Sequence, residues 1–182
     1  MKKLIFNSIM FGLFIYPFSI NKSNFKPNLN IPSTSNFSKE LYQHVDSIIK
    51  HYKSPLTTSN LLQQSEKYEI DIHFMVAQGI LESHLGTKGR SLKTNSVFGV
   101  GMYDNKTILS YSHPDESVEP YTKLISENYL DTKNGITELH LMKNGSYINK
   151  EGNRYASYLS YEQKLRFIYN QLKQDFKNKY GN

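Results

Sequence analysis

The chain contains no cysteine among its 182 residues. Disulfide bonds, thiolate metal sites, cysteine nucleophiles and a lipid on an N-terminal cysteine are therefore all excluded. The sequence also has no glycine-rich phosphate loop and no Gly-x-Ser-x-Gly nucleophile turn. The histidines are scattered without the spacing of metal ligands, so we expect neither a metal site nor any other cofactor; they are His44, His51, His73, His84, His113 and His140.

A run of basic residues is also missing, although the chain is basic overall. Lys and Arg number 22 against 16 Asp and Glu, which gives a net charge of +6 and a pI near 9.3. Such a charge favours an anionic partner, and nucleic acid, anionic lipid and the bacterial cell wall all qualify. Because the sequence carries no Lys/Arg-rich run and no nucleic-acid-binding motif, nucleic acid is not an expected partner.

The N-terminal segment is apolar. Met1-Lys-Lys3 precedes the uncharged residues 4–20, so residues 1–20 are predicted to be a signal peptide or an N-terminal membrane anchor. An Ala-x-Ala cleavage pattern is missing, which leaves the anchor open as a membrane tether; a buried N-terminal helix is a third interpretation. Residues 21–37 have linker composition, with Pro27 and Pro32 among Asn and Ser. The chain is therefore expected to be exported to the cell envelope, the periplasm or the extracellular space, or to belong to a phage virion.

Residues 38–182 are predicted to form one mainly helical domain, and 14 Tyr and 10 Phe offset a low apolar content of 38%. Apolar residues at 3- and 4-residue spacing predict successive helices. Ser38, Asp71 and Ser160 are expected to cap three of them, Pro55 to end the first, and Pro114 to begin another. Residues 135–142 are read as a short helix, and residues 97–112 around Asp104-Asn105 as a small β-hairpin. The functional cleft is expected between this hairpin and the helices.

Glu82 stands out because it ends an apolar helical stretch, residues 72–86. A charged carboxylate is costly to bury there, and the group can relieve the cost by holding its proton near neutral pH, as a general acid must. The polar residues 87–95 follow, so the acid is expected where a core helix opens into a cleft, which is typical of a sugar-cleaving site. The alternative is a helix-end carboxylate paired with a nearby cation: Lys88, Arg90 or Lys93.

Three short motifs occur in order within residues 38–177: Ala77-Gln78-Gly-Ile-Leu-Glu82-Ser83, Asn95-Ser-Val-Phe98-Gly99-Val, and Tyr155-Ala156 followed by Tyr161 and Leu165. Together they resemble the β-N-acetylglucosaminidase family of bacterial autolysins and flagellar or phage muralytic enzymes. That family resembles lysozyme in fold and cuts the glycan strand of peptidoglycan. The resemblance therefore implies a lysozyme-like helical domain with a small β-hairpin lobe, and peptidoglycan glycan strands as its substrate.

The resemblance also implies roles for individual residues. Glu82 would be the general acid that protonates the glycosidic oxygen. Tyr155 would stand across the cleft, contacting the sugar or steadying the developing charge. Asn95 and Phe98 would shape the loop and the floor beside the acid. For Tyr155 and Phe98, packing in the core is the alternative interpretation.

A second catalytic carboxylate is not evident, although hydrolases of this kind often have one in the β lobe. Asp104 fits a turn equally well, and Asp115 and Glu116 fit the first turn of a helix; Glu119 is the fourth candidate. A lytic transglycosylase giving 1,6-anhydro-muramyl ends and a catalytically inactive wall-binding or virion structural module therefore stay open. The Gly-Leu-Met-Gln segment usual in lytic transglycosylases is absent, which favours a glucosaminidase. The sequence does not predict an oligomeric state.

Overall fold

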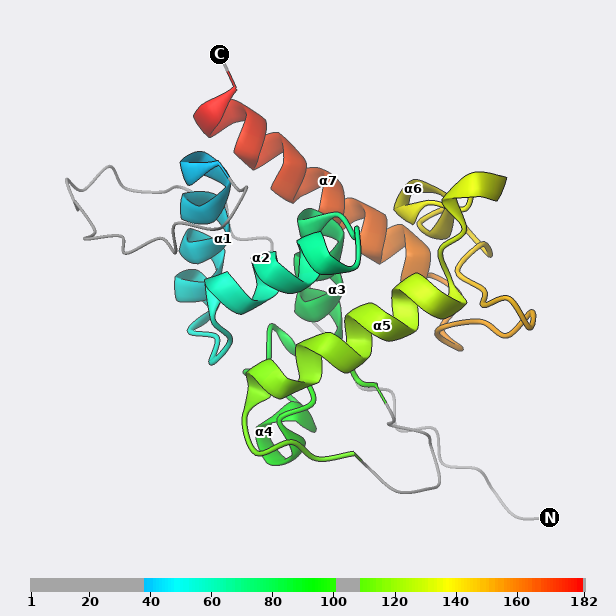
Figure 1. Cartoon of the computed structure of the whole chain (residues 1–182), viewed down its shortest axis with the longest axis horizontal. Coiled ribbons are helices and arrows are strands. Elements are labelled where there is room, and N and C mark those ends of the chain that lie inside the picture. The colour runs from blue at the N-terminus through cyan, green and yellow to red at the C-terminus, as the bar shows by residue number, and fades with distance from the viewer. Residues whose placement is uncertain (1–37, 101–108, 182) are drawn as a thin grey trace. The chain divides into compact units, whose positions relative to one another are not determined.

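The computed structural model describes residues 38–100 and 109–181, and nearly all of their regular structure is helical (Figure 1). Within these residues, extended pairing is limited to two isolated β-bridges, Asp131 with Ile136 and Ile148 with Arg154. The predicted mainly helical class is confirmed. The elements are α1 (Lys39–Tyr52), α2 (Thr58–Lys67), α3 (Ile72–Ser83), α4 (Ser91–Thr94), η1 (Pro114–Ser117), α5 (Val118–Asn128), η2 (Thr132–Asn134), α6 (Glu138–Leu141) and α7 (Tyr161–Tyr180).

The helix ends follow their capping residues at most of the predicted positions. The Ser38 side chain accepts a hydrogen bond from the Leu41 amide at the start of α1, and Asp71 accepts one from the His73 amide at the start of α3. Helix α1 ends at Tyr52, shortly before Pro55. Ser160 is the N-cap residue of α7, as predicted, but its side chain makes no capping hydrogen bond.

Two other predicted elements take a different form. Pro114 begins a 3₁₀ turn, η1, which leads directly into α5, so the predicted helix start is correct but its first turn is tighter than an α-helix. The short helix predicted for residues 135–142 is only α6, because Gly135 ends η2 with a positive φ of 79° and Ile136 forms the bridge to Asp131.

Helix α3 lies at the centre of the core. Ten of its twelve residues are buried, as expected for a helix that is apolar on almost every side. It packs against α7 and α2, while α2 also contacts α1 and α5 (Figure 1). Gly79 permits close packing here, since a Cβ at this position would lie 2.8 Å from Leu85 Cδ2 and 3.1 Å from Phe98 Cε1. The helix end that carries Glu82 is thereby held by packing on several sides.

Some predictions fall outside the described residues. The leader, the linker and the Asp104-Asn105 turn of the predicted hairpin are among them, so all three stay predictions. The described flanks of the hairpin, residues 97–100 and 109–112, contain no strand, and the Tyr111 amide donates instead to the Thr94 carbonyl. Among the helices that the structure describes, none has both the length and the apolar character needed to cross a bilayer.

Candidate active site

Glu82 lies in the last turn of α3, where the chain leaves the core. His84 and Leu85 both adopt positive φ, 51° and 57°, and their amides donate back to the Ile80 and Gly79 carbonyls, which ends the helix sharply. The Ser83 hydroxyl donates to the Val97 carbonyl at 2.7 Å and accepts from the Gly86 amide at 2.8 Å. The second motif, residues 95–100, is thus tied to the helix end beside the acid.

A cavity of about 140 Å³ opens beside the acid. The cavity is lined by Glu82 and Ser83 at the end of α3, and by residues in and around α4. The latter are Arg90, Ser91, Ser96, Val97 and Gly99. Gly99 has a φ of 71°, and a Cβ there would lie 3.4 Å from Glu82 Oε2. The absence of a side chain at residue 99 therefore leaves that carboxyl oxygen open to the cavity.

Burial raises the pKa of Glu82 from its ordinary value of 4.5 to about 7, and the hydrogen bond from Tyr161 opposes the rise. By accessible surface Glu82 is an exposed residue that lines the cavity, although nearby protein atoms desolvate its carboxyl group. In the described part of the chain no Lys or Arg forms an ion pair with Glu82, which argues against the alternative of a helix-end carboxylate held by a cation. The group therefore has the proton affinity that a general acid needs near neutral pH.

Tyr161 contacts the acid directly, and Gln78 contacts it through Tyr161. Neither was predicted as a site residue. The Tyr161 hydroxyl donates to Glu82 Oε1 at 2.5 Å and accepts from Gln78 Nε2 at 3.2 Å. Gln78 is completely buried, and its Oε1 accepts from two further tyrosines, Tyr121 at 2.8 Å and Tyr147 at 2.9 Å. A glutamine one helical turn before the acid, in the apolar middle of the helix, was the signal that could have identified this network.

Tyr155 lies at the edge of the same tyrosine cluster. Its hydroxyl donates to the Phe98 carbonyl at 3.1 Å, its ring stacks on Tyr147 at 4.5 Å, and it is 5.6 Å from the Tyr161 ring. Burial raises the pKa of Tyr155 well above 10, and the charge of Glu82 contributes to the rise. Tyr155 therefore lies close enough to the acid for their charges to interact, while its hydroxyl is engaged by the backbone of the second motif.

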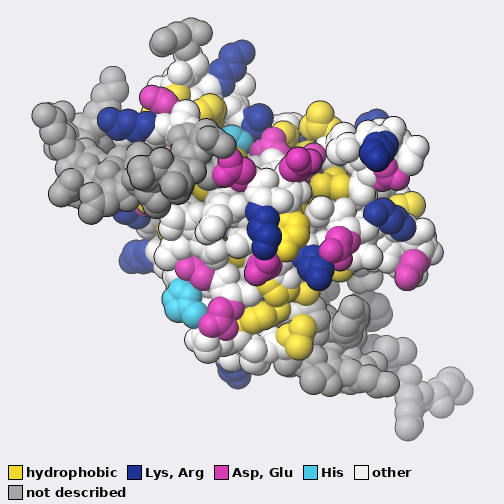
Figure 2. Space-filling model, in the orientation of Figure 1, with side chains coloured by type: hydrophobic (Ala, Val, Ile, Leu, Met, Phe, Trp, Pro, Cys, Tyr) yellow, Lys and Arg dark blue, Asp and Glu magenta, His cyan; other side chains and the backbone are white. Residues whose placement is uncertain are grey.

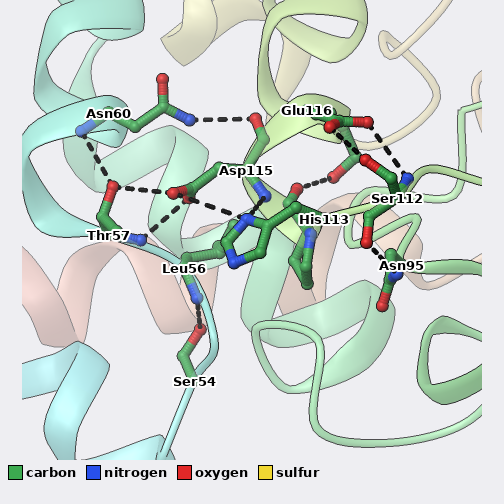
Figure 3. Close-up of polar contacts among 11 residues, drawn as sticks. Ser54, Leu56, Thr57, Asn60, Asn95, Ser112, His113, Asp115 and Glu116 are labelled. Carbon is green, nitrogen blue, oxygen red and sulfur yellow. Dashed lines mark hydrogen bonds and ion pairs between the residues drawn. The ribbon is translucent and has the colours of Figure 1, made fainter.

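Phe98 and Asn95 occupy different environments. The Phe98 side chain is buried and stacks on Tyr121 with ring centroids 4.0 Å apart, so it supports the site from the core. Asn95 ends α4 with a φ of 54°, and its Nδ2 donates to the Tyr111 carbonyl at 2.9 Å and the Ser112 carbonyl at 3.3 Å (Figure 3). Asn95 thereby connects the end of α4 to residues 111 and 112.

Three of the four candidates for a second carboxylate are held in other contacts, and none of them lines the cavity with Glu82. Asp115 accepts from the amide and the hydroxyl of Thr57, and Glu116 accepts from the amide and the hydroxyl of Ser112 (Figure 3). Glu119 pairs with Lys67 and accepts from Tyr68. Asp104 lies outside the described residues. The described part of the site therefore offers one carboxyl group.

Comparison with known proteins confirms the family resemblance. The sequence model of the Glucosaminidase family, described as mannosyl-glycoprotein endo-β-N-acetylglucosaminidase, matches residues 58–174. Two relatives from Streptococcus pneumoniae, from the strains TIGR4 and R6, are each named putative endo-β-N-acetylglucosaminidase. Each is 28% identical over 107 residues, which cover 56% of this chain but only 16% and 15% of those relatives. The matched span contains Glu82, the cavity and the Gln78–Tyr161 network, and the chain accordingly belongs to the Glucosaminidase family of glycosidases.

Proposed function

We propose that the chain hydrolyses the glycan strand of peptidoglycan as an endo-β-N-acetylglucosaminidase, with Glu82 as the general acid. The observation that carries the proposal is a single carboxyl group, free of any cation among the described residues, beside a cavity and with its pKa raised to about 7. Membership in the Glucosaminidase family supports the choice of bond. The charge of +6 suits the anionic polymers of a bacterial wall.

The reaction needs one proton transfer to break the bond. Protonated Glu82 gives its proton to the glycosidic oxygen, the bond between that oxygen and C1 of N-acetylglucosamine breaks, and the shortened glycan leaves with the proton. Water then adds to C1, which has oxocarbenium character, and its released proton restores Glu82. A general acid of this kind contributes about 10²- to 10⁴-fold in rate, and it works best when its pKa lies near the working pH.

The test is mass spectrometry of purified peptidoglycan digested by the chain and, in parallel, by Glu82→Gln. We expect soluble fragments with reducing N-acetylglucosamine ends from the unchanged chain and none from the variant. Circular dichroism and thermal unfolding must show that the variant is folded. A folded Glu82→Gln variant that keeps more than a tenth of the activity would refute the assignment of the acid.

The lone carboxyl group of the described site favours a second candidate, a lytic transglycosylase. In that reaction the 6-hydroxyl of muramic acid attacks its own C1, so one residue can act first as acid and then as base. Fragments with 1,6-anhydro-muramyl ends would identify it. A third candidate is a wall-binding or virion structural module without turnover, which would bind insoluble peptidoglycan and release no fragment.

The location and further partners of the chain belong to the same proposal. Export, through a leader that is cleaved or retained as a tether, would bring the domain to its substrate. Nucleic acid is not proposed as a partner, because Lys and Arg lie interspersed with Asp and Glu on the face that Figure 2 shows and form no large basic patch there. Salt-dependent binding of DNA at submicromolar affinity would reverse that judgement.

A further inference from the structure

The polar chain behind Glu82 reaches from the cavity into the centre of the core. Its members come from four parts of the sequence: Gln78 and Glu82 from α3, Tyr121 from α5, Tyr147 from the segment after α6, and Tyr161 from α7. We propose that Gln78 is a positioning residue that acts through Tyr161, forcing its hydroxyl to donate to Glu82 Oε1, so that the acidic proton is presented on Oε2 toward the cavity. The inference rests on the proposed role of Glu82 as the general acid.

The orientation of the Gln78 amide is fixed by its two tyrosine donors. Its Oε1 accepts from both the Tyr121 and the Tyr147 hydroxyls, which uses both lone pairs of the amide oxygen. A reversed amide would leave those two hydroxyl protons without an acceptor, since Gln78 is the partner that each of them has in the described part of the chain. Both tyrosines are completely buried, so such a loss would be costly. The NH₂ group must therefore face Tyr161.

The direction of the hydrogen bond between Tyr161 and Glu82 follows from the bond that Gln78 donates to Tyr161. Because the Tyr161 oxygen accepts from Gln78 Nε2, its single proton is free to point at Glu82 Oε1, 2.5 Å away. A donor that is itself hydrogen-bonded in this way is polarised and becomes a stronger donor. Gln78 cannot titrate, so it keeps this direction at every pH at which the protein is folded.

The consequence at Glu82 is a distinction between its two oxygens. Oε1 accepts the bond from Tyr161, so the proton of the neutral acid resides on Oε2. Oε2 is the oxygen that a Cβ at Gly99 would approach to 3.4 Å, and Gly99 lines the cavity together with Glu82. The network therefore places the transferable proton on the side where a glycosidic oxygen can enter. It also keeps the pKa of Glu82 from rising further, because a donated bond stabilises the charged form.

The pH dependence of kcat/KM tests the proposal in three variants of the full chain. Tyr161→Phe removes the donor, so the pKa of Glu82 rises and the alkaline limb of the profile moves up by about one pH unit. Gln78→Met removes the bond that orients the Tyr161 hydroxyl, so we expect the alkaline limb to move in the same direction but by less. In the double variant the shift should equal that of Tyr161→Phe alone. Additive shifts, or a lowered kcat at every pH with an unmoved limb, would overturn the proposal.

Tyr169→Phe is the matched control. Tyr169 also lies on α7 and its hydroxyl also donates to a carboxylate, Asp71 at 2.9 Å, but at the opposite end of α3. It should leave the alkaline limb in place. A limb that moves in Tyr169→Phe as much as in Tyr161→Phe would show that the shift reflects loosened packing of α7 and would overturn the proposal.

A measurement on the unchanged protein does not require that Gln78→Met fold or that the chain be an enzyme. We expect the side-chain NH₂ signals of Gln78 in a ¹⁵N NMR titration to move with the same midpoint as the ¹³C signal of the Glu82 carboxyl group, and to stop moving in Tyr161→Phe. Gln78 signals that stay still while Glu82 titrates would overturn the proposal. Failure of the proposed function would appear separately, as intact peptidoglycan after incubation with the unchanged chain.

Discussion

Gly99 offers a way to disturb the space beside the acid without changing the acid itself. Its φ of 71° lies in the left-handed region, and a Cβ at this residue would stand 3.4 Å from Glu82 Oε2 and 4.0 Å from Glu82 Cδ. These are ordinary van der Waals distances, so Gly99→Ala should fold without a clash. The new methyl group would, however, occupy space that a glycosidic oxygen needs, since that oxygen must come within about 3 Å of the acid.

Gly89 provides a control with the same backbone. Its φ is also 71°, and a Cβ there would meet no atom within 4 Å. An alanine in the left-handed region costs about 1–2 kcal/mol, partly offset by the lower entropy of the unfolded chain, so each variant should lose about 1 kcal/mol of stability. For a domain of this size the melting temperature should fall by about 3 °C in both. The backbone effect is therefore matched, and only Gly99→Ala places an atom beside the acid.

Activity separates the two variants. We expect Gly99→Ala to lose about 100-fold in kcat/KM on soluble glycan fragments, because a displacement of about 1 Å between reacting groups costs that much. Gly89→Ala should keep its activity. Equal losses of activity in the two variants would show that the strained backbone, and not the space beside Oε2, accounts for the effect. Full activity in Gly99→Ala would refute the inference that the substrate approaches Oε2 from the side of residue 99.

Three further predictions concern stability. Glu162 is 1% exposed, and Arg154 Nη2 donates to both of its carboxyl oxygens, at 2.6 and 2.8 Å. Arg154→Met should therefore lower the free energy of unfolding in urea by about 3 kcal/mol, and changing both residues to Met should restore most of that loss. A double variant less stable than the single one would contradict this. Because the folded pKa of Glu82 is raised to about 7, the folded state binds more protons than the unfolded state, and stability should fall as pH rises from about 4.5 to 7. Glu82→Gln should lack this decrease in a series of unfolding curves, and an unchanged pH slope would contradict it. Burial lowers the pKa of His44 to about 4, and the charges of His73 and Lys179 add to the effect. The unfolded state therefore binds more protons, and stability should also fall as pH drops from about 6.5 to 4. His44→Phe should reduce that loss, and an unchanged dependence of stability on pH in this range would refute the prediction.

Features encoded by neighbouring residues were accessible from the sequence. The cap at Ser38, the cap at Asp71 and the helix break before Pro55 depend on hydrogen bonds and sterics within a few positions. Glu82 was singled out as the candidate acid because a carboxyl group in an apolar helix is a local conflict. The three motifs indicated the family, which the family model confirms, because their residues and their order can be read directly along the chain. Ser160 takes the predicted position before α7, but its ψ of 19° lies outside the extended region usual for a capping residue, and its side chain makes no capping hydrogen bond.

The site around Glu82 is a product of the tertiary structure. Tyr161 follows Glu82 by 79 residues and Tyr147 follows Gln78 by 69, and no periodicity could have joined them. From the sequence, Asp115 and Glu116 were candidates for a second carboxylate, but in the structure they accept hydrogen bonds from Thr57 and Ser112. The sequence by itself indicated Glu82 as the candidate acid and predicted the helix that carries it. The structure decided what the acid touches, because burial, hydrogen-bond direction and the pKa of a carboxyl group depend on atoms that only the folded chain brings together.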